Sequence, residues 1–212
     1  MATSLSDGAV LPQTPSVHIV DSESRRIKKL IIEAASELYE KKGLHETSVG
    51  EIAEKAGISV PVTYHYVRRK SDIMLLIMED FTHQIKDHIP PKIESLPGPR
   101  EKLVAAIEIF YGLVHQNMGK VVLVYRKSRT LDRVGRSKIM ADEAEHIQIF
   151  EGIIEEGIQA GVFKRVDVNL IAYNILMAGH AWALKHWHFR KRFDLEHYVR
   201  RQTDFILSAI SA

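Results

Sequence analysis

Apolar residues recur at helical spacing from Ser24 onward, within a stretch that also carries several basic residues. The apolar positions of this first stretch are Ile27, Leu30, Ile31, Ala34 and Leu38. Side chains three and four positions apart lie on one face of an α-helix, so the set predicts a helix with a buried stripe. Gly43 follows, and glycine is common just past a helix C-terminus. We therefore expect the first helix to end at Gly43.

Two short helical patterns come next. The first consists of Val49, Ile52, Ala53 and Ala56. Thr47 precedes it and is expected to cap it, because a side-chain oxygen there can accept an unpaired backbone N–H. Gly57 is expected to end this second helix. Ser59 is expected to cap the third, with Pro61 in its first turn, where a missing N–H costs nothing.

The remainder of the chain carries only helical patterns. They cover residues 73–89, 103–115, 121–129, 139–160, 170–188 and, after the cap Asp194, 195–210. The segment PPKIESLPGPRE (90–101) holds four of the seven prolines and is expected to break the chain. Gly161 is expected to end the helix before it. No stretch alternates with period two for long, so the predicted fold class is all-α, with about nine helices.

The composition is that of an ordinary globular protein, with 45% hydrophobic and 26% charged residues in 212. There are no cysteines, which excludes disulfides, thiolate metal sites and cysteine nucleophiles. The N-terminal stretch does not resemble a secretory signal, and no segment reaches the roughly 18 apolar residues that span a bilayer. We therefore expect a cytoplasmic protein. A net charge of +2 decides little, because nucleic acids bind local basic patches.

Three parts are expected along the chain. Residues 1–22 are rich in Ser, Thr, Pro and Gly without periodicity, which is typical of a disordered arm. Residues 23–72 hold the first three predicted helices, and residues 73–212 hold the remaining ones.

Residues 23–72 predict a helix-turn-helix, because a short helix, a tight turn and another short helix succeed one another. Ala53 places only a methyl group between the helices, and Gly57 can adopt the positive φ that the turn requires. In this motif the start of the second helix meets base edges in the major groove, while helix ends and hydroxyls meet phosphates. The predicted DNA-contacting residues are Thr47, Ser48, Ser59, Val60, Pro61, Val62, Thr63, Tyr64, His65, Tyr66 and Lys70.

The stretch TSVGEIAEKAGISVPVTYHYVRRKSDI (47–73) resembles the DNA-binding segment of TetR-family transcriptional regulators. Pro61 and Val67 stand where that family usually has Gly and Phe. Val62 replaces a hydroxyl residue, and Thr63 moves a hydroxyl one position along. The apolar Val60, Pro61 and Val62 can contact thymine methyl groups but cannot hydrogen-bond guanine. We therefore expect thymine-rich half-sites read partly by shape, with His65 as the main polar reader and Arg25 or Arg26 near a minor groove.

Residues 73–212 are expected to bind a ligand and to form a homodimer. Two recognition helices one DNA turn apart require two copies, and the last two helices are apolar enough to pair between protomers. Small residues, namely Ala178, Gly179, Ala181 and Ala183, would permit close approach. The family resemblance implies a small-molecule effector that competes with DNA. Candidate effector contacts are Phe81, Phe110, Val114, Met118, Tyr125, Phe150, Met177 and Trp182.

The segment VYRKSRTLDRVGRSK (124–138) suggests what the effector is. It carries six basic residues in 15 positions, which suits an anion. The segment resembles its counterpart in TetR-family regulators of fatty-acid and sterol breakdown, which sense acyl-CoA thioesters. Arg126 and Arg129 are the residues expected to bind its phosphates. We therefore expect a repressor that binds a palindromic DNA operator and is released by an acyl-CoA.

Three alternatives stay open at this point. The effector can instead be an aromatic or cationic lipophile, as in efflux control. A small all-α metal-dependent enzyme would use Glu79, His83 and Asp87, which share one helix face. A helical interaction module with a vestigial DNA head is the third. We prefer a regulator that is not an enzyme and has no metal and no cofactor, because no catalytic arrangement stands out.

Overall fold

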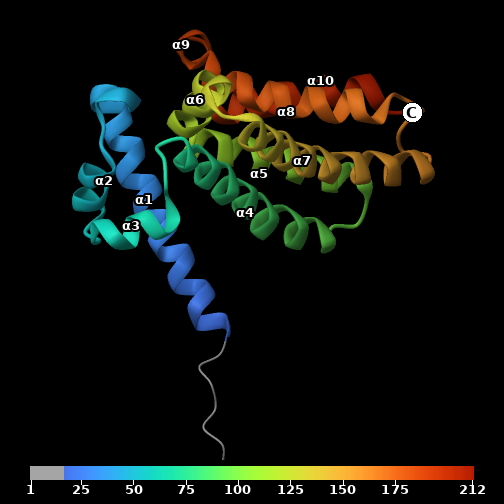
Figure 1. Ribbon diagram of the computed structural model, residues 1–212. Coiled ribbons are helices and arrows are strands. Elements are labelled where there is room, and N and C mark those ends of the chain that lie inside the picture. The colour runs from blue at the N-terminus through green and yellow to red at the C-terminus, as the bar shows by residue number, and fades with distance from the viewer. Residues whose placement is uncertain (1–16) are drawn as a thin grey trace, which may run out of the picture.

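The computed structural model describes residues 17–212 and shows a small helical head joined to a larger helical body (Figure 1). The head comprises α1 (Val17–Glu46), α2 (Val49–Ala56) and α3 (Val60–Tyr66). The body comprises α4 (Asp72–Glu94), α5 (Pro99–Gln116), α6 (Met118–Lys127), α7 (Arg133–Gln159), α8 (Val168–Leu184), α9 (His186–Phe189) and α10 (Leu195–Ile210). A 3₁₀ turn, Ser128–Thr130, joins α6 to α7. The described range contains no strands, which confirms the all-α prediction.

Helix boundaries differ from the prediction at several places, and the helix predicted over 170–188 is divided into α8 and α9. α1 begins at Val17, so residues 17–22 are helical and are not part of an arm; residues 1–16 lie outside the described range. α4 runs through Pro90 and Pro91 to Glu94, so the first two prolines of the 90–101 segment do not break the chain. Proline has a helical φ, so α4 accommodates both residues at the cost of one backbone hydrogen bond each. The break falls between Ser95 and Gly98 instead.

Glycines and caps set most other helix ends as predicted. Gly43 has φ +86° and a non-helical backbone, so the long part of α1 ends there as predicted and one short turn follows to Glu46. Gly161 has φ +70° after α7. Asp194 caps α10 by accepting a hydrogen bond from the His197 amide at 2.8 Å. Asp132 caps α7 in the same way through the Gly135 amide at 2.9 Å, so this helix begins earlier than its apolar pattern does.

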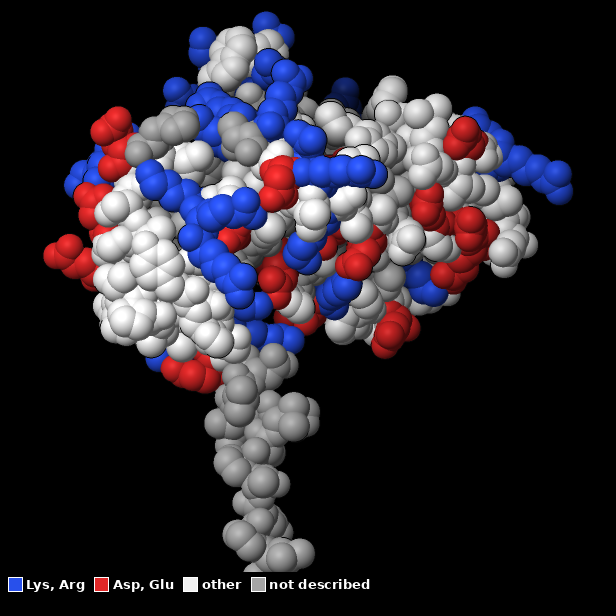
Figure 2. Space-filling view, viewed as in Figure 1, with Lys and Arg blue, Asp and Glu red and all other residues white. Residues whose placement is uncertain are grey.

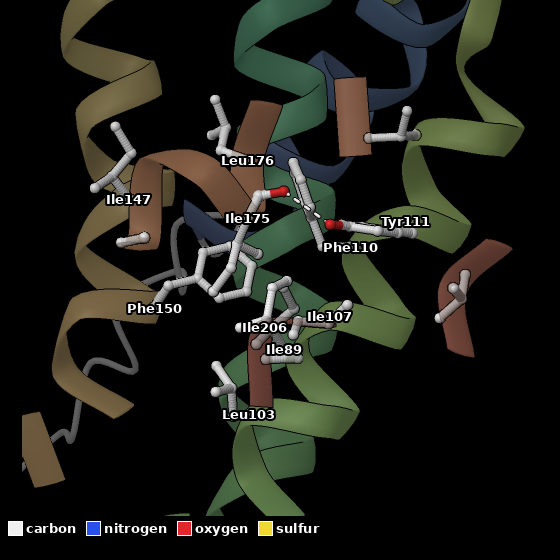
Figure 3. Close-up of a cluster of buried hydrophobic side chains, with 14 of the residues drawn as sticks. Ile89, Leu103, Ile107, Phe110, Tyr111, Ile147, Phe150, Ile175, Leu176 and Ile206 are labelled. Carbon is white, nitrogen blue, oxygen red and sulfur yellow. Dashed lines mark hydrogen bonds between the residues drawn. The ribbon is translucent and has the colours of Figure 1, made fainter. Parts of the chain in front are cut away.

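The body is built around a core in which α4, α5, α7 and α8 meet (Figure 3). Phe110 is fully buried, and its ring lies edge-on to that of Phe150, with centroids 5.6 Å apart. The Tyr111 hydroxyl donates to the Ile175 carbonyl at 3.0 Å, the contact drawn in Figure 3. Burying each such aromatic ring contributes roughly 1.5–3 kcal/mol.

A second core joins the head to the body. It contains Ile31 and Ile32 of α1, Ile52 of α2 and, in the first half of α4, Ile73 and Met74, all essentially without exposure. The same cluster reaches Val124, Leu131 and Ile139 of the body. The head is therefore packed directly on α4 and α6, and the cluster continues into α7, which packs on α4. Among the described helices, none is long and apolar enough to cross a membrane.

Candidate DNA-binding head and effector cavity

α2 and α3 form the predicted helix-turn-helix. The Ser48 hydroxyl accepts from the Glu51 amide at 3.2 Å, and the Glu51 carboxylate accepts from the Ser48 amide at 2.8 Å. This reciprocal capping box makes Ser48 the cap of α2, so the prediction of Thr47 as the cap was wrong. Gly57 has φ +66° in the turn, and Ser59 caps α3 through the Val62 amide at 3.4 Å.

The outward face of α3 is uncharged. Val60, Val62 and Tyr64 are 42%, 37% and 50% exposed, and Pro61 and His65 are also exposed. Figure 2 shows the surface over this part of the head as largely white, with a band of Lys and Arg beside it. These five side chains can enter a groove, and His65 is the strongest hydrogen-bonding group among them.

Two residues predicted to contact DNA are not on this surface. Thr47 and Thr63 are fully buried. The Thr47 hydroxyl donates to the Gly43 carbonyl at 2.9 Å, and the Thr63 hydroxyl donates to the Ser59 carbonyl at 3.2 Å. Both hydroxyls are used inside the head, so we remove both side chains from the candidate DNA contacts. The prediction that Thr63 supplies the hydroxyl missing at position 62 is therefore also withdrawn.

The basic residues after α3 partly hold the head together. The Lys70 ammonium donates to the Leu44 carbonyl at 3.2 Å near the end of α1. Arg69 pairs with Asp132 of the body at 3.1 Å and with Asp72 at 3.6 Å. Arg68 is exposed, and Tyr66 is partly buried. Phosphate contacts fit Arg68 and the end of α2 at Ser48 best, because helix N-termini favour anions.

A small apolar cavity lies in the body between α4, α6, α7 and α8. Its volume is about 30 Å³. The apolar wall residues are Ile77, Met78, Phe81, Val121, Val124 and Ile139. The polar wall residues are Asn117, Lys120, Tyr125, Glu143, His146 and His180.

Two buried histidines supply the polar contacts of this wall. His146 Nε2 lies 2.9 Å from the Thr82 hydroxyl, and His180 Nδ1 lies 2.8 Å from the Tyr125 hydroxyl. Burial lowers the pKa of His146 to about 4, and burial also lowers the pKa of His180 to about 4. Both rings are therefore neutral at pH 7 and can each donate or accept a hydrogen bond.

Only some of the residues predicted to contact the effector line the cavity. Phe81 and Tyr125 line the cavity, and the Tyr125 hydroxyl also lies 3.6 Å from the Met177 sulfur. Four others lie in the core next to it, namely Phe110, Val114, Phe150 and Trp182. Met118 and Arg126 lie on the face of α6 that points away from the cavity. Arg129 is exposed and does not line the cavity.

Sequence reasoning missed His146 and His180 as cavity residues. The other buried residues of α8 are apolar, and those of α7 are apolar except for Asp142. A histidine within an apolar stripe was the available signal, but it does not reveal which other helix it faces.

The metal-enzyme alternative is not supported by the structure. The Glu79 carboxylate pairs with Lys28 of α1 at 2.6 Å, and His83 Nε2 lies 3.9 Å from it. Glu79 therefore belongs to the contact between α1 and α4. Over the described residues, no group of three acidic, histidine or cysteine side chains could hold a metal ion.

Comparison with known proteins agrees with this architecture. A model of bacterial regulatory proteins of the tetR family matches residues 31–77, and a model of the tetracyclin repressor-like C-terminal domain matches residues 97–208. The transcriptional regulator HbdR of Aromatoleum sp. (strain CIB) is 33% identical over 169 residues, covering 80% of this chain and 74% of that protein. The fatty acid metabolism regulator protein of Bacillus subtilis is 28% identical over 66% of this chain and 73% of its own.

Solved structures give the same result. FadR of Bacillus subtilis, crystallised with stearoyl-CoA, superimposes with a TM-score of 0.70 at 25% identity, covering 85% of this chain and 97% of that one. PfmR of Thermus thermophilus has the same TM-score and identity over 84% and 97%. The helix-turn-helix head, the helical body and both family matches together show that this chain belongs to the TetR family of transcriptional regulators.

Proposed function

We propose that this regulator binds a palindromic operator as a homodimer, represses transcription, and releases DNA when an acyl-CoA thioester enters the cavity of the body. The observation that carries the proposal is that the cavity and the head share a wall. Ile77, Val124 and Ile139 line the cavity and also belong to the core that holds the head. A ligand that moves this wall therefore moves the surface on which the head is packed.

The small size of the cavity indicates that an effector would oppose DNA binding. Ligand pockets in proteins commonly measure roughly 300–1,000 Å³. A cavity of about 30 Å³ cannot hold an acyl chain unless α4 separates from α6 and α7. Because Ile73 and Met74 of α4 are buried in the head core, that separation shifts the head. DNA and effector then favour different arrangements and oppose each other through one equilibrium.

The chemistry of the wall suits a thioester. The apolar residues accept an acyl chain, while the Tyr125 hydroxyl and the neutral His180 ring can hydrogen-bond a carbonyl oxygen. The relative FadR of Bacillus subtilis was crystallised with stearoyl-CoA, which supports the same class of ligand here.

The dimer interface is proposed on the exposed apolar side of α8 and α10. Leu170, Tyr173 and Met177 of α8 are 57%, 39% and 36% exposed and recur at helical spacing. Phe205 of α10 is 70% exposed. Apolar side chains gathered on a surface mark interaction sites, and a second copy would cover this face.

DNA reading is proposed to rest on α3. Val60, Pro61 and Val62 present apolar groups that fit thymine methyls, and His65 supplies the polar contact. Selection of binding sites from random DNA tests this directly. We expect two-fold symmetric sites with thymine in each half. Guanine runs without a thymine preference would contradict the assignment.

A second class of effector is favoured by Glu143, an acidic side chain in the cavity wall beside the aromatic Phe81 and Tyr125. These residues would suit an aromatic or cationic lipophile. A thermal-shift panel separates the two classes: acyl-CoAs of several chain lengths, the matching free acids, and lipophilic cations. Stabilisation by thioesters alone supports our proposal, and stabilisation by the cations alone would replace it.

A further inference from the structure

A second, larger cleft lies between the head and the body. Its volume is about 720 Å³, and its walls come from the end of α1, from α6, and from the junction of α8 and α9. The cleft uses Val122, Leu123 and Arg126 of α6, whereas the effector cavity uses Val121 and Tyr125. The two spaces therefore lie on opposite faces of α6.

Polar groups without partners gather in the walls of this cleft. Among the side chains that the structure describes, five buried nitrogen or oxygen atoms have no hydrogen-bond partner, and three of them belong to wall residues. These three are the Ser36 hydroxyl, the Tyr39 hydroxyl and His186 Nδ1. Tyr39 is only 7% exposed. A buried polar group left unpaired costs about 1–3 kcal/mol. Each of these three atoms has almost no accessible surface, so a ligand in the cleft pairs with them only when the side chains that cover them turn aside.

The charges of the cleft indicate the sign of that ligand. Arg126, Lys127 and Lys42 are wall residues, against the single acid Glu46. Lys42 is paired with Glu51 outside the cleft, but no salt bridge to Arg126 forms within the described range. Burial raises the pKa of Tyr39, so its hydroxyl stays a hydrogen-bond donor at neutral pH.

The rest of the lining is apolar. It includes Leu44 of α1, Met118, Val122 and Leu123 of α6, and Ala183 of α8. A ligand that fits this wall has an apolar body as well as a charged group. Inorganic ions alone would leave the apolar surface uncovered.

We propose that this cleft is a second ligand site for a small organic anion, a carboxylate or phosphate on an apolar body. Its oxygens accept hydrogen bonds from the exposed Arg126 and, when the side chains that cover its hydroxyl turn aside, from Tyr39. Its apolar body lies on Val122 and Leu123. The site goes beyond the proposed function, because it is separate from the acyl cavity. Since Tyr39 belongs to the head and Arg126 to the body, an occupant ties the two parts together.

The test uses calorimetric titration of the full-length protein with three probes: benzoate, inorganic phosphate and coenzyme A without an acyl group. A Trp187→Phe background leaves Trp182 as the single tryptophan. The Trp182 ring lies 5.0 Å from that of His186, so its fluorescence reports occupancy of the cleft independently. We expect binding of benzoate and a change in Trp182 emission.

Two substitutions locate the binding. Arg126→Gln removes the cation, and Tyr39→Phe removes only the unpaired hydroxyl, so it should fold normally. Each should weaken binding about tenfold, as expected for hydrogen bonds to a charged group. Arg133→Gln is the matched control, since Arg133 is exposed and outside the cleft; it should bind as the parent does.

The outcomes separate the sources of the anion. Binding of benzoate that both substitutions weaken establishes an independent ligand. Binding of coenzyme A alone, weakened in the same way, assigns the anion site to the phosphates of a thioester. The proposal is overturned if no probe binds at millimolar concentration, or if neither substitution changes the affinity. Neither result depends on whether acyl chains enter the other cavity or release DNA.

Discussion

Gly179 lies where α8 packs against α5. A Cβ atom at this position would lie 2.7 Å from the Phe110 ring and 2.9 Å from the Tyr111 ring. Both rings are fully buried and cannot move aside cheaply. The sequence suggested Gly179 as a small residue for pairing between protomers. The structure uses it within one protomer, because the aromatic rings of α5 fill the space against which it lies.

Gly179→Ala is therefore expected to destabilise the protein by about 1–3 kcal/mol through overpacking. Gly112→Ala is the matched control, since a Cβ atom there meets nothing within 4 Å. Alanine is the better helix former, so the control should gain up to about 1 kcal/mol. Urea denaturation of both variants measures the difference. Equal stability of the two would show that α8 is not held this close to α5.

The two buried histidines predict a loss of stability in acid. The pKa of each is about 4 in the folded protein, compared with 6.5 as the ordinary value. Between these values the unfolded chain binds more protons, so this contribution to stability is complete above about pH 6.5 and is lost as the pH falls toward 4. His146→Gln removes one titrating group and should reduce the fall of the melting temperature over that range. An unchanged pH profile would contradict the buried, neutral state of His146.

At the scale of elements, the short helices of the head depend on their caps. α2 has only eight residues and α3 only seven, which is too short for stability from helix propensity alone. The capping box of Ser48 and Glu51 satisfies backbone groups at the start of α2, and the core around Ile52 holds the helix in place.

Ser48→Ala is expected to cost about 1 kcal/mol of folding free energy, the usual value of an N-cap. Ser59→Ala should cost less, because the Ser59 hydroxyl lies 3.4 Å from its amide partner, compared with 3.2 Å for Ser48. Thermal denaturation without DNA measures both. A larger loss for Ser59→Ala would reverse this ranking of the caps.

Local signals explain which elements were predictable from sequence. Gly43, Gly57 and Gly161 all adopt positive φ, and Ser59 and Asp194 cap helices as predicted. The burial of Thr47 and Thr63 was not predictable, because it depends on how the helices of the head pack together. Only some residues of the effector cavity were predicted, because its wall forms where four separate helices meet.

At the scale of the whole molecule, the head and the body are connected by packing and by charge. The head core continues into α4, α6 and α7, and the ion pairs Lys28–Glu79 and Arg69–Asp132 join α1 to α4 and the end of the head to α7. Exposed ion pairs contribute little, about 0–1 kcal/mol, so the shared core is the stronger link. A change at Ile77 therefore reaches both the cavity and the head.

The proposed dimer makes a prediction at this scale. Leu170→Glu combined with Phe205→Glu places charges on the exposed apolar face of α8 and α10 and should give monomers in sedimentation experiments. The monomer should keep its helical content, because both side chains are exposed. Val134→Glu is the control, since Val134 is 78% exposed on α7. A double variant that remains dimeric would place the interface elsewhere.

The most direct test of the account is fluorescence anisotropy on a selected palindromic site. The protein is titrated at two salt concentrations, and acyl-CoAs are then added. We predict tight binding that weakens steeply with salt, since several phosphates are contacted, and that a thioester reverses. Tight binding that no thioester reverses would contradict the effector. Failure to select any site would contradict the role of α3 in reading DNA, and binding indifferent to salt would contradict the proposed phosphate contacts.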